Sequence, residues 1–175
     1  MSLRATALAA LIPFALAAQA AVPAAVAMTQ SALPHGTFVL DRAPDLDKGI
    51  QAFVAQAPAA QRAQLAARLK DVDPLYKEVA LGTAGEALSL SFERRDPLLL
   101  PLSGQAVTWT RAGEPIQVSA RPSLSGLLQT YQAADGTRTN EFILLPDGRL
   151  ILSVQVHVNG LPKDLSYKVV YRAAK

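Results

Sequence analysis

The spacing of apolar side chains changes once along this chain, from a helical repeat to a two-residue repeat. The helical repeat comes first and carries five apolar side chains: Leu46, Ile50, Phe53, Val54 and Ala57. Their spacing places them on one face of a helix, and Asp45 in front of them is a favourable N-cap. A second helix is expected from Pro58 to Pro74, with Leu65 and Leu69 on its apolar side and Arg68 outward. The pattern therefore predicts two short helices joined by a tight turn.

From Tyr76 onward, apolar and polar side chains alternate, which is typical of antiparallel strands with one buried face. Asp135-Gly136, Asp147-Gly148 and Asn159-Gly160 favour tight hairpin turns between such strands. Nine strands are expected after the helices, over residues 76–83, 86–94, 98–102, 105–111, 114–121, 124–133, 137–145, 149–159 and 164–172. A short strand at 37–41, before the helices, makes ten.

Ten consecutive strands with short turns predict an all-β fold. We expect a ten-stranded antiparallel up-and-down barrel, capped by a helix-turn-helix between strands 1 and 2. Two interpretations of the helix pair stay open, since it is expected either to cover a cavity or to plug the end of a filled barrel.

This order of elements resembles the fatty-acid-binding-protein branch of the calycin superfamily. Gly36-Thr37-Phe38 stands where that family usually has Gly-x-Trp, and the resemblance extends over about residues 36–172. It implies a barrel that holds a lipid-like ligand. Members often end with an inward Arg-x-Tyr pair that binds the ligand carboxylate. Here Tyr171 is in place, but Val169 occupies the Arg position, so the usual carboxylate contact is expected to be missing.

The first residues have the pattern of a secretory signal. Arg4 supplies the positive start, and an almost uncharged apolar run follows it. Ala18-Gln19-Ala20 and Ala25-Val26-Ala27 are two cleavage sites, of which the second is preferred. The run is interrupted and is short for a membrane span of about 20 residues.

We therefore expect three segments: a cleaved signal peptide at 1–27, a flexible segment at 28–35, and a calycin-like barrel domain at 36–175. The mature protein is expected to be periplasmic or secreted, without membrane insertion after signal removal. The chain has no cysteine, which excludes disulfides and a thiolate metal site. Its net charge is +3 and its basic residues are scattered, so no nucleic-acid partner is expected.

The sequence offers little for catalysis. His35 precedes the first strand, and His157 lies on the polar side of a strand without an evident catalytic partner. No spacing of His, Asp or Glu indicates a metal site, and no phosphate-binding or dinucleotide-binding motif is present. We expect no enzyme activity, no metal and no cofactor.

The side chains expected to point into the barrel are better candidates for a functional site. Eight side chains on or near this phase are candidate ligand contacts: Phe92, Trp109, Arg111, Tyr131, Arg138, Phe142, Tyr167 and Tyr171. Pockets for apolar ligands are lined by such aromatic side chains with a few polar groups, and a buried Arg needs an anionic partner. Two alternatives stay open, because the aromatic side chains could simply fill a small barrel and both Arg could lie at wet strand ends.

Two functions follow. The first is non-enzymatic binding of an apolar or amphipathic, lipid-like small molecule inside a capped barrel. The alternative is a protein–protein interaction module of the envelope, such as a periplasmic inhibitor or assembly partner, which would act through loops at 94–97 and 161–164.

Overall fold

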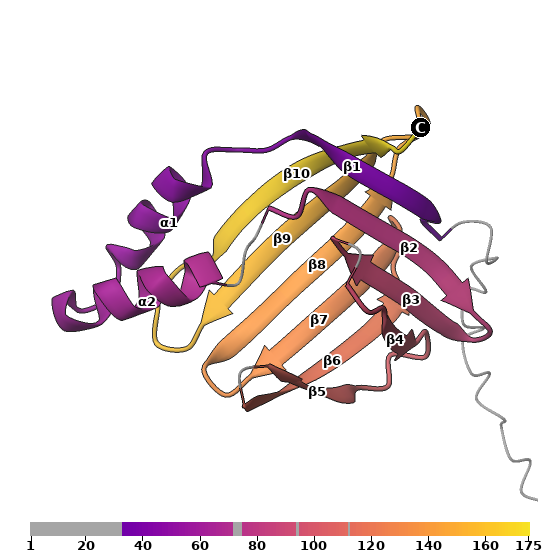
Figure 1. Cartoon of the computed structure of the whole chain (residues 1–175). Helices are drawn as coiled ribbons and strands as arrows, with labels where there is room; N and C mark the ends of the chain where they lie inside the picture. The colour runs from indigo at the N-terminus through magenta and orange to yellow at the C-terminus, as the bar shows by residue number, and fades with distance from the viewer. Residues whose placement is uncertain (1–32, 72–74, 94, 112) are drawn as a thin grey trace, which may run out of the picture.

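The computed structural model describes residues 33–71, 75–93, 95–111 and 113–175. In this part of the chain, ten strands and two helices follow one another (Figure 1). The helices are α1 (Leu46–Val54) and α2 (Ala59–Asp71). The strands are β1 (Gly36–Arg42), β2 (Glu78–Ala84), β3 (Ala87–Phe92), β4 (Leu98–Pro101), β5 (Val107–Arg111), β6 (Glu114–Pro122), β7 (Leu127–Ala133), β8 (Gly136–Leu144), β9 (Leu150–Val158) and β10 (Leu165–Ala173).

All ten strands belong to one antiparallel sheet in the order β4-β3-β2-β1-β10-β9-β8-β7-β6-β5. The sheet curls so far that β1, the first strand, pairs with both β2 and β10. Its two edges are β4 and β5, so the barrel is nearly closed (Figure 1). The predicted all-β fold is confirmed, with ten strands and two helices between β1 and β2.

One predicted strand is too long at its start. The strand expected from residue 124 begins at Leu127. The backbone N–H of Ser123 donates to the Gly126 carbonyl at 2.9 Å, which makes the intervening residues a turn. The predicted start was too early because alternation alone does not mark where a hairpin turns.

The register of β7 to β10 stacks the inward-facing side chains in three layers. The core layer contains Leu127, Phe142, Leu152 and Val169. The polar layer contains Gln129, Asn140, Val154 and Tyr167. The cavity layer contains Tyr131, Arg138, Val156 and Leu165. Because successive inward residues are two apart, each layer lies one such step further along the barrel axis.

The core layer belongs to a solid hydrophobic core at the closed end of the barrel. Leu127, Phe142, Leu152, Val169 and the nearby Tyr171 are all 0% exposed. Leu33, from the segment predicted to be flexible, is also buried in this core. The other residues of that segment up to 32, and the predicted signal peptide at 1–27, lie outside the described residues.

The helices lie at the other end of the barrel, away from the C-terminus (Figure 1). Asp45 caps α1, since its Oδ1 accepts a hydrogen bond from the Lys48 N–H at 3.1 Å. Ile50 and Phe53 of α1 pack with Leu165 of β10 in a second, smaller apolar cluster. Within the described ranges, neither helix has the length and apolar character that crossing a bilayer requires.

Candidate ligand-binding site

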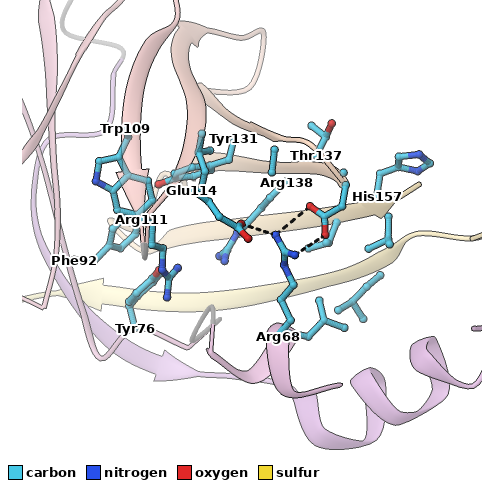
Figure 2. Close-up of a pocket in the computed structure, with 18 of the residues that line it drawn as sticks. Arg68, Tyr76, Phe92, Trp109, Arg111, Glu114, Tyr131, Thr137, Arg138 and His157 are labelled. Atoms are coloured by element: carbon cyan, nitrogen blue, oxygen red, sulfur yellow. Dashed lines mark hydrogen bonds and ion pairs between the residues drawn. The ribbon is translucent and has the colours of Figure 1, made fainter. Parts of the chain in front are cut away.

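A cavity of about 790 Å³ lies between the two helices and the barrel interior. α1 and α2 contribute Leu46, Ile50, Leu65 and Leu69, and the strands contribute most of the other side chains around it. Five aromatic residues line it: Tyr76, Phe92, Trp109, Tyr131 and Tyr167. Figure 2 shows Tyr76, Phe92, Trp109 and Tyr131 around one side of this space. The helix pair therefore covers a cavity, which answers one of the questions that the sequence left open.

The aromatic rings contact one another in pairs. Tyr76 stacks on Phe92 with ring centroids 4.1 Å apart, and Trp109 meets Tyr131 edge to face at 6.1 Å. Such pairs contribute about 0.5–1.5 kcal/mol beyond the area that they bury. The rings on this wall are therefore held in place by one another as well as by the hydrophobic core, against which all four pack.

A chain of polar side chains forms the boundary between the cavity and the closed core. Arg138 Nε donates to Asn140 Oδ1 at 3.0 Å, and Asn140 Nδ2 donates to Gln129 Oε1 at 3.0 Å. Asn140 is 1% exposed and Gln129 is 0% exposed. Buried amides need such partners, because an unpaired polar group costs about 1–3 kcal/mol. The chain fixes one edge of the Arg138 guanidinium and turns the rest of it toward the cavity.

Arg138 brings a positive charge to this site. Its Nη2 is buried and has no hydrogen-bond partner among the described residues. A buried charge is costly unless it is paired. The cavity therefore contains a donor that an anion or a strong acceptor would satisfy.

Tyr131 lies directly opposite Arg138 in the β7–β8 register. Burial raises the pKa of the Tyr131 phenol, and the charge of Arg138 and a hydrogen bond with Gln129 only partly offset this effect. The phenol therefore stays neutral at ordinary pH and does not offset the charge of the guanidinium.

The rim of the cavity carries a forked ion pair. Figure 2 shows Arg68 of α2 pointing toward Glu114, from which it lies 2.9 Å. Arg68 also lies 3.1 Å from Asp135, and all three residues border the cavity. Arg68 is exposed, as expected for an outward side chain, but the sequence did not reveal the two carboxylates with which its guanidinium pairs. Arg68 is one residue before Leu69 and three after Leu65, so it lies at the edge of the apolar face, where that spacing could have placed it.

The eight side chains proposed from the sequence fall into two groups. Six border the cavity: Phe92, Trp109, Arg111, Tyr131, Arg138 and Tyr167. Phe142 and Tyr171 do not border it and lie in the solid core, where both are 0% exposed. Alternation gives the direction in which a side chain points, but the depth along the barrel depends on the register, which the sequence did not supply. A ligand-binding role for any of the eight stays a prediction.

His157 has a partner that the sequence did not reveal. Its Nδ1 lies 2.8 Å from Asp164 Oδ1, and Gln155 donates to the other carboxylate oxygen at 2.7 Å. The hydrogen bond with His157 is the main reason why the pKa of Asp164 is lowered. Among the described residues, no group of three or more His, Cys, Asp or Glu side chains is placed to hold a metal ion.

Of the two loops proposed for protein contacts, the one at 94–97 lies next to the cavity and the one at 161–164 lies next to a second recess. Arg95, Asp96 and Pro97 border it, while Arg94 is outside the described residues. Leu161 lines a second recess of about 280 Å³ beside α2 and the β9–β10 turn. The first loop is therefore part of the surroundings of the cavity, and a protein partner for either loop stays a prediction.

Three solved structures show what this chain is similar to. A secretory abundant heat soluble protein from Ramazzottius varieornatus has a TM-score of 0.58 and 13% identity, covering 80% of this chain and 94% of the other. A Schistosoma mansoni fatty-acid-binding protein in complex with arachidonic acid has a TM-score of 0.52 and 14% identity, covering 83% and 98%. Fatty-acid-binding protein 1 of Echinococcus granulosus has a TM-score of 0.51 and 10% identity, covering 81% and 97%.

The sequence itself gives no such match. No protein-family model matches it, and no curated protein matches it significantly. The likeness to solved structures covers almost the whole length of each of the three proteins, at identities of 10–14%. It extends to the described barrel and its helical cap, and the fold of this chain is therefore that of the fatty-acid-binding proteins.

Proposed function

We propose that this protein binds a lipid-like amphipathic molecule without transforming it. The observation that carries this proposal is an apolar cavity of about 790 Å³ that contains the buried, unpartnered Nη2 of Arg138. A volume of this size lies within the range of about 300–1,000 Å³ that is usual for small-molecule sites. The apolar part of the ligand would occupy the aromatic-lined space, and its acidic head group would pair with Arg138.

The three layers suggest why the head group binds at Arg138 and no deeper. Val169, in the position where the family resemblance implies an Arg, lies in the core layer beside Leu152. A head group there would have to replace close-packed apolar contacts. Arg138 lies two layers nearer to the helices, where open space begins. The binding depth would therefore be set by the polar layer beneath Arg138.

The structural comparisons support the part of this proposal that concerns the class of ligand. One similar structure is a fatty-acid-binding protein with arachidonic acid bound, and another is also a fatty-acid-binding protein. At such low identity they support a lipid-like ligand class. The nature of the head group rests on Arg138 alone.

The experiment compares a long-chain fatty acid with the corresponding alcohol, using quenching of Trp109 fluorescence as the readout. Trp109 is the only Trp in the chain and borders the cavity. Arg138→Gln should weaken fatty-acid binding by about tenfold to a hundredfold, as expected for losing a charged hydrogen bond of about 1.5–3 kcal/mol. Binding of the alcohol should change by less than about threefold, since it does not depend on the charge.

Arg172→Gln serves as the matched control, because Arg172 is exposed on the outer side of β10. Fatty-acid affinity should be unchanged in this variant. Native mass spectrometry of the parent protein provides an independent readout through the mass of a co-purified lipid. If the parent binds neither compound and carries no lipid, the proposed function is wrong.

We also propose that the protein works outside the cytoplasm, on the basis of the signal-like pattern at residues 1–27. The mass of the mature chain tests this directly. A mass that corresponds to cleavage after Ala20 or Ala27 supports export, whereas an uncleaved chain in the cytoplasmic fraction contradicts it.

A further inference from the structure

The two helices of the cap are anchored to different extents. α1 buries four of its nine residues: Leu46, Ile50, Phe53 and Val54. α2 is longer, yet Leu69 is the one fully buried side chain among those described for it, with Leu65 and Ala66 only partly buried. Since apolar burial is the main force that holds a helix on a barrel, moving α2 costs less free energy than moving α1.

Arg68 supplies α2 with a second attachment, to the rim of the barrel. Its Nη2 lies 2.9 Å from Glu114 Oε2, at the start of β6. Its Nη1 lies 3.1 Å from Asp135 Oδ2, in the turn between β7 and β8. One guanidinium therefore joins α2 to two hairpins, through carboxylates 46 and 67 positions further along the chain.

The position of Asp135 is fixed by close packing. Gly136, the next residue, is buried, and a Cβ there would collide with the carbonyl oxygen of His157 on β9. The turn is thus pressed against the neighbouring strand and presents Asp135 to α2 from a rigid support. Each carboxylate is anchored to the sheet, so the element that can move away is α2.

We propose that Arg68, Glu114 and Asp135 form a latch that holds α2 over the cavity and limits the rate of ligand exchange. This inference rests on the proposed function, because it assigns a control step to the same cavity. Leu65 and Leu69 border the cavity from the same helix as Arg68. Displacing α2 would therefore open the cavity and break both ion pairs at once.

The latch should be weakened by salt. The side chains of Arg68, Glu114 and Asp135 remain 45%, 60% and 46% exposed, so mobile ions reach them. The Debye length falls from about 30 Å at 0.01 M salt to about 3 Å at 1 M. Exposed ion pairs are individually weak, and we expect the loss of both to accelerate exchange by about threefold to tenfold.

The cap contains a matched control pair. Lys70 Nζ lies 3.0 Å from Asp47 Oδ1, which joins α2 to α1 and not to the barrel rim. Their side chains are exposed to a similar extent, at 58% and 72%. Lys70→Gln thus removes one cation and one ion pair from α2 without touching the latch.

The experiment measures exchange of a fluorescent fatty-acid analogue by stopped flow, in the parent protein, Arg68→Gln and Lys70→Gln. Arg68→Gln should raise both the association and the dissociation rate by about threefold to tenfold, because a latch changes the barrier. The dissociation constant should change by less than about twofold. High salt should accelerate the parent and Lys70→Gln, but hardly affect Arg68→Gln.

A second measurement needs no ligand. Hydrogen exchange of the α2 amides should be faster in Arg68→Gln than in the parent, and unchanged in Lys70→Gln. If the parent binds the analogue but neither the rates nor the hydrogen exchange respond to Arg68→Gln, the latch is wrong and the proposed function stands. If only the dissociation rate and the dissociation constant change, Arg68 contacts the ligand itself, which also overturns the latch. Failure of the parent to bind overturns the proposed function, while hydrogen exchange still tests the attachment of α2.

Discussion

The core layer and the cavity layer come from the same four strands and the same alternating pattern, yet they have opposite physical characters. The core layer, Leu127, Phe142, Leu152 and Val169, is apolar and fully buried. The cavity layer contains Tyr131 and Arg138 and faces open space. The difference shows that an inward-pointing side chain is not by itself a core side chain. The volume, the polarity and the neighbours of each layer decide whether the barrel is filled at that depth.

The largest expected effect concerns the free energy of unfolding. A substitution in the core layer should lower it more than a substitution at the wall of the cavity. Phe142→Ala should lower the free energy of unfolding by about 3–5 kcal/mol, because it opens a void in close-packed surroundings. Trp109→Ala should cost less than half of that, since Trp109 already borders a cavity and its removal creates little new void. Urea unfolding at constant m-value measures both. Equal losses would show that the two ends of the barrel are packed alike.

A medium effect on the free energy of unfolding is expected at the polar layer, which separates the core layer from the cavity layer. Asn140→Leu removes the partner of Gln129 Oε1 and of Arg138 Nε together. We expect a loss of about 1–3 kcal/mol, the cost of leaving buried polar groups unpaired. In the double variant with Gln129→Leu, part of this loss should be recovered, because one orphaned group is removed. A strictly additive double-mutant cycle would contradict the linked chain of hydrogen bonds.

The smallest effects concern the surface turns at the two ends of the barrel. Asp147 is paired with Arg149 at the β8–β9 turn, and Asp164 with His157 near the helices, and both carboxyl pKa values are lowered from 3.8. A carboxyl with a lowered pKa in the folded state binds fewer protons there than in the unfolded chain. Its contribution to stability is therefore present above pH 3.8 and is lost as the pH falls through the lowered folded pKa.

Two Asn variants measure this contribution. Asp147→Asn and Asp164→Asn should each make the urea midpoint slightly less sensitive to acid than in the parent, while the rest of the acid response remains. The two variants should behave alike, since both carboxyls are on the surface. A steeper acid dependence in either variant would contradict the assigned direction of the pKa change.

The sequence was sufficient to predict the order of the strands and helices. It was insufficient to predict how far along the barrel axis each inward-facing side chain lies. The alternation in β8 placed Arg138 and Phe142 on one inward face, but only the cross-strand register shows which layer each belongs to. The contact of His157 with Asp164 was likewise invisible, because it depends on how a hairpin turn brings residues seven positions apart together. The ion pairs of Arg68 were not predicted for a related reason, since helical spacing locates a face and does not reveal the carboxylates opposite it.

The seam between β1 and β10 has a consequence for how the chain reaches this fold. Leu40 pairs with Tyr171, so the first and last strands of the barrel join residues about 130 positions apart. Closing so long a loop carries a substantial entropy cost, and contacts of this kind slow folding. During synthesis, β1 lacks one of its two strand partners until β10 has emerged from the ribosome. The seam can therefore form only after β10 has been made, and every partly made chain that lacks β10 has an open edge at β1.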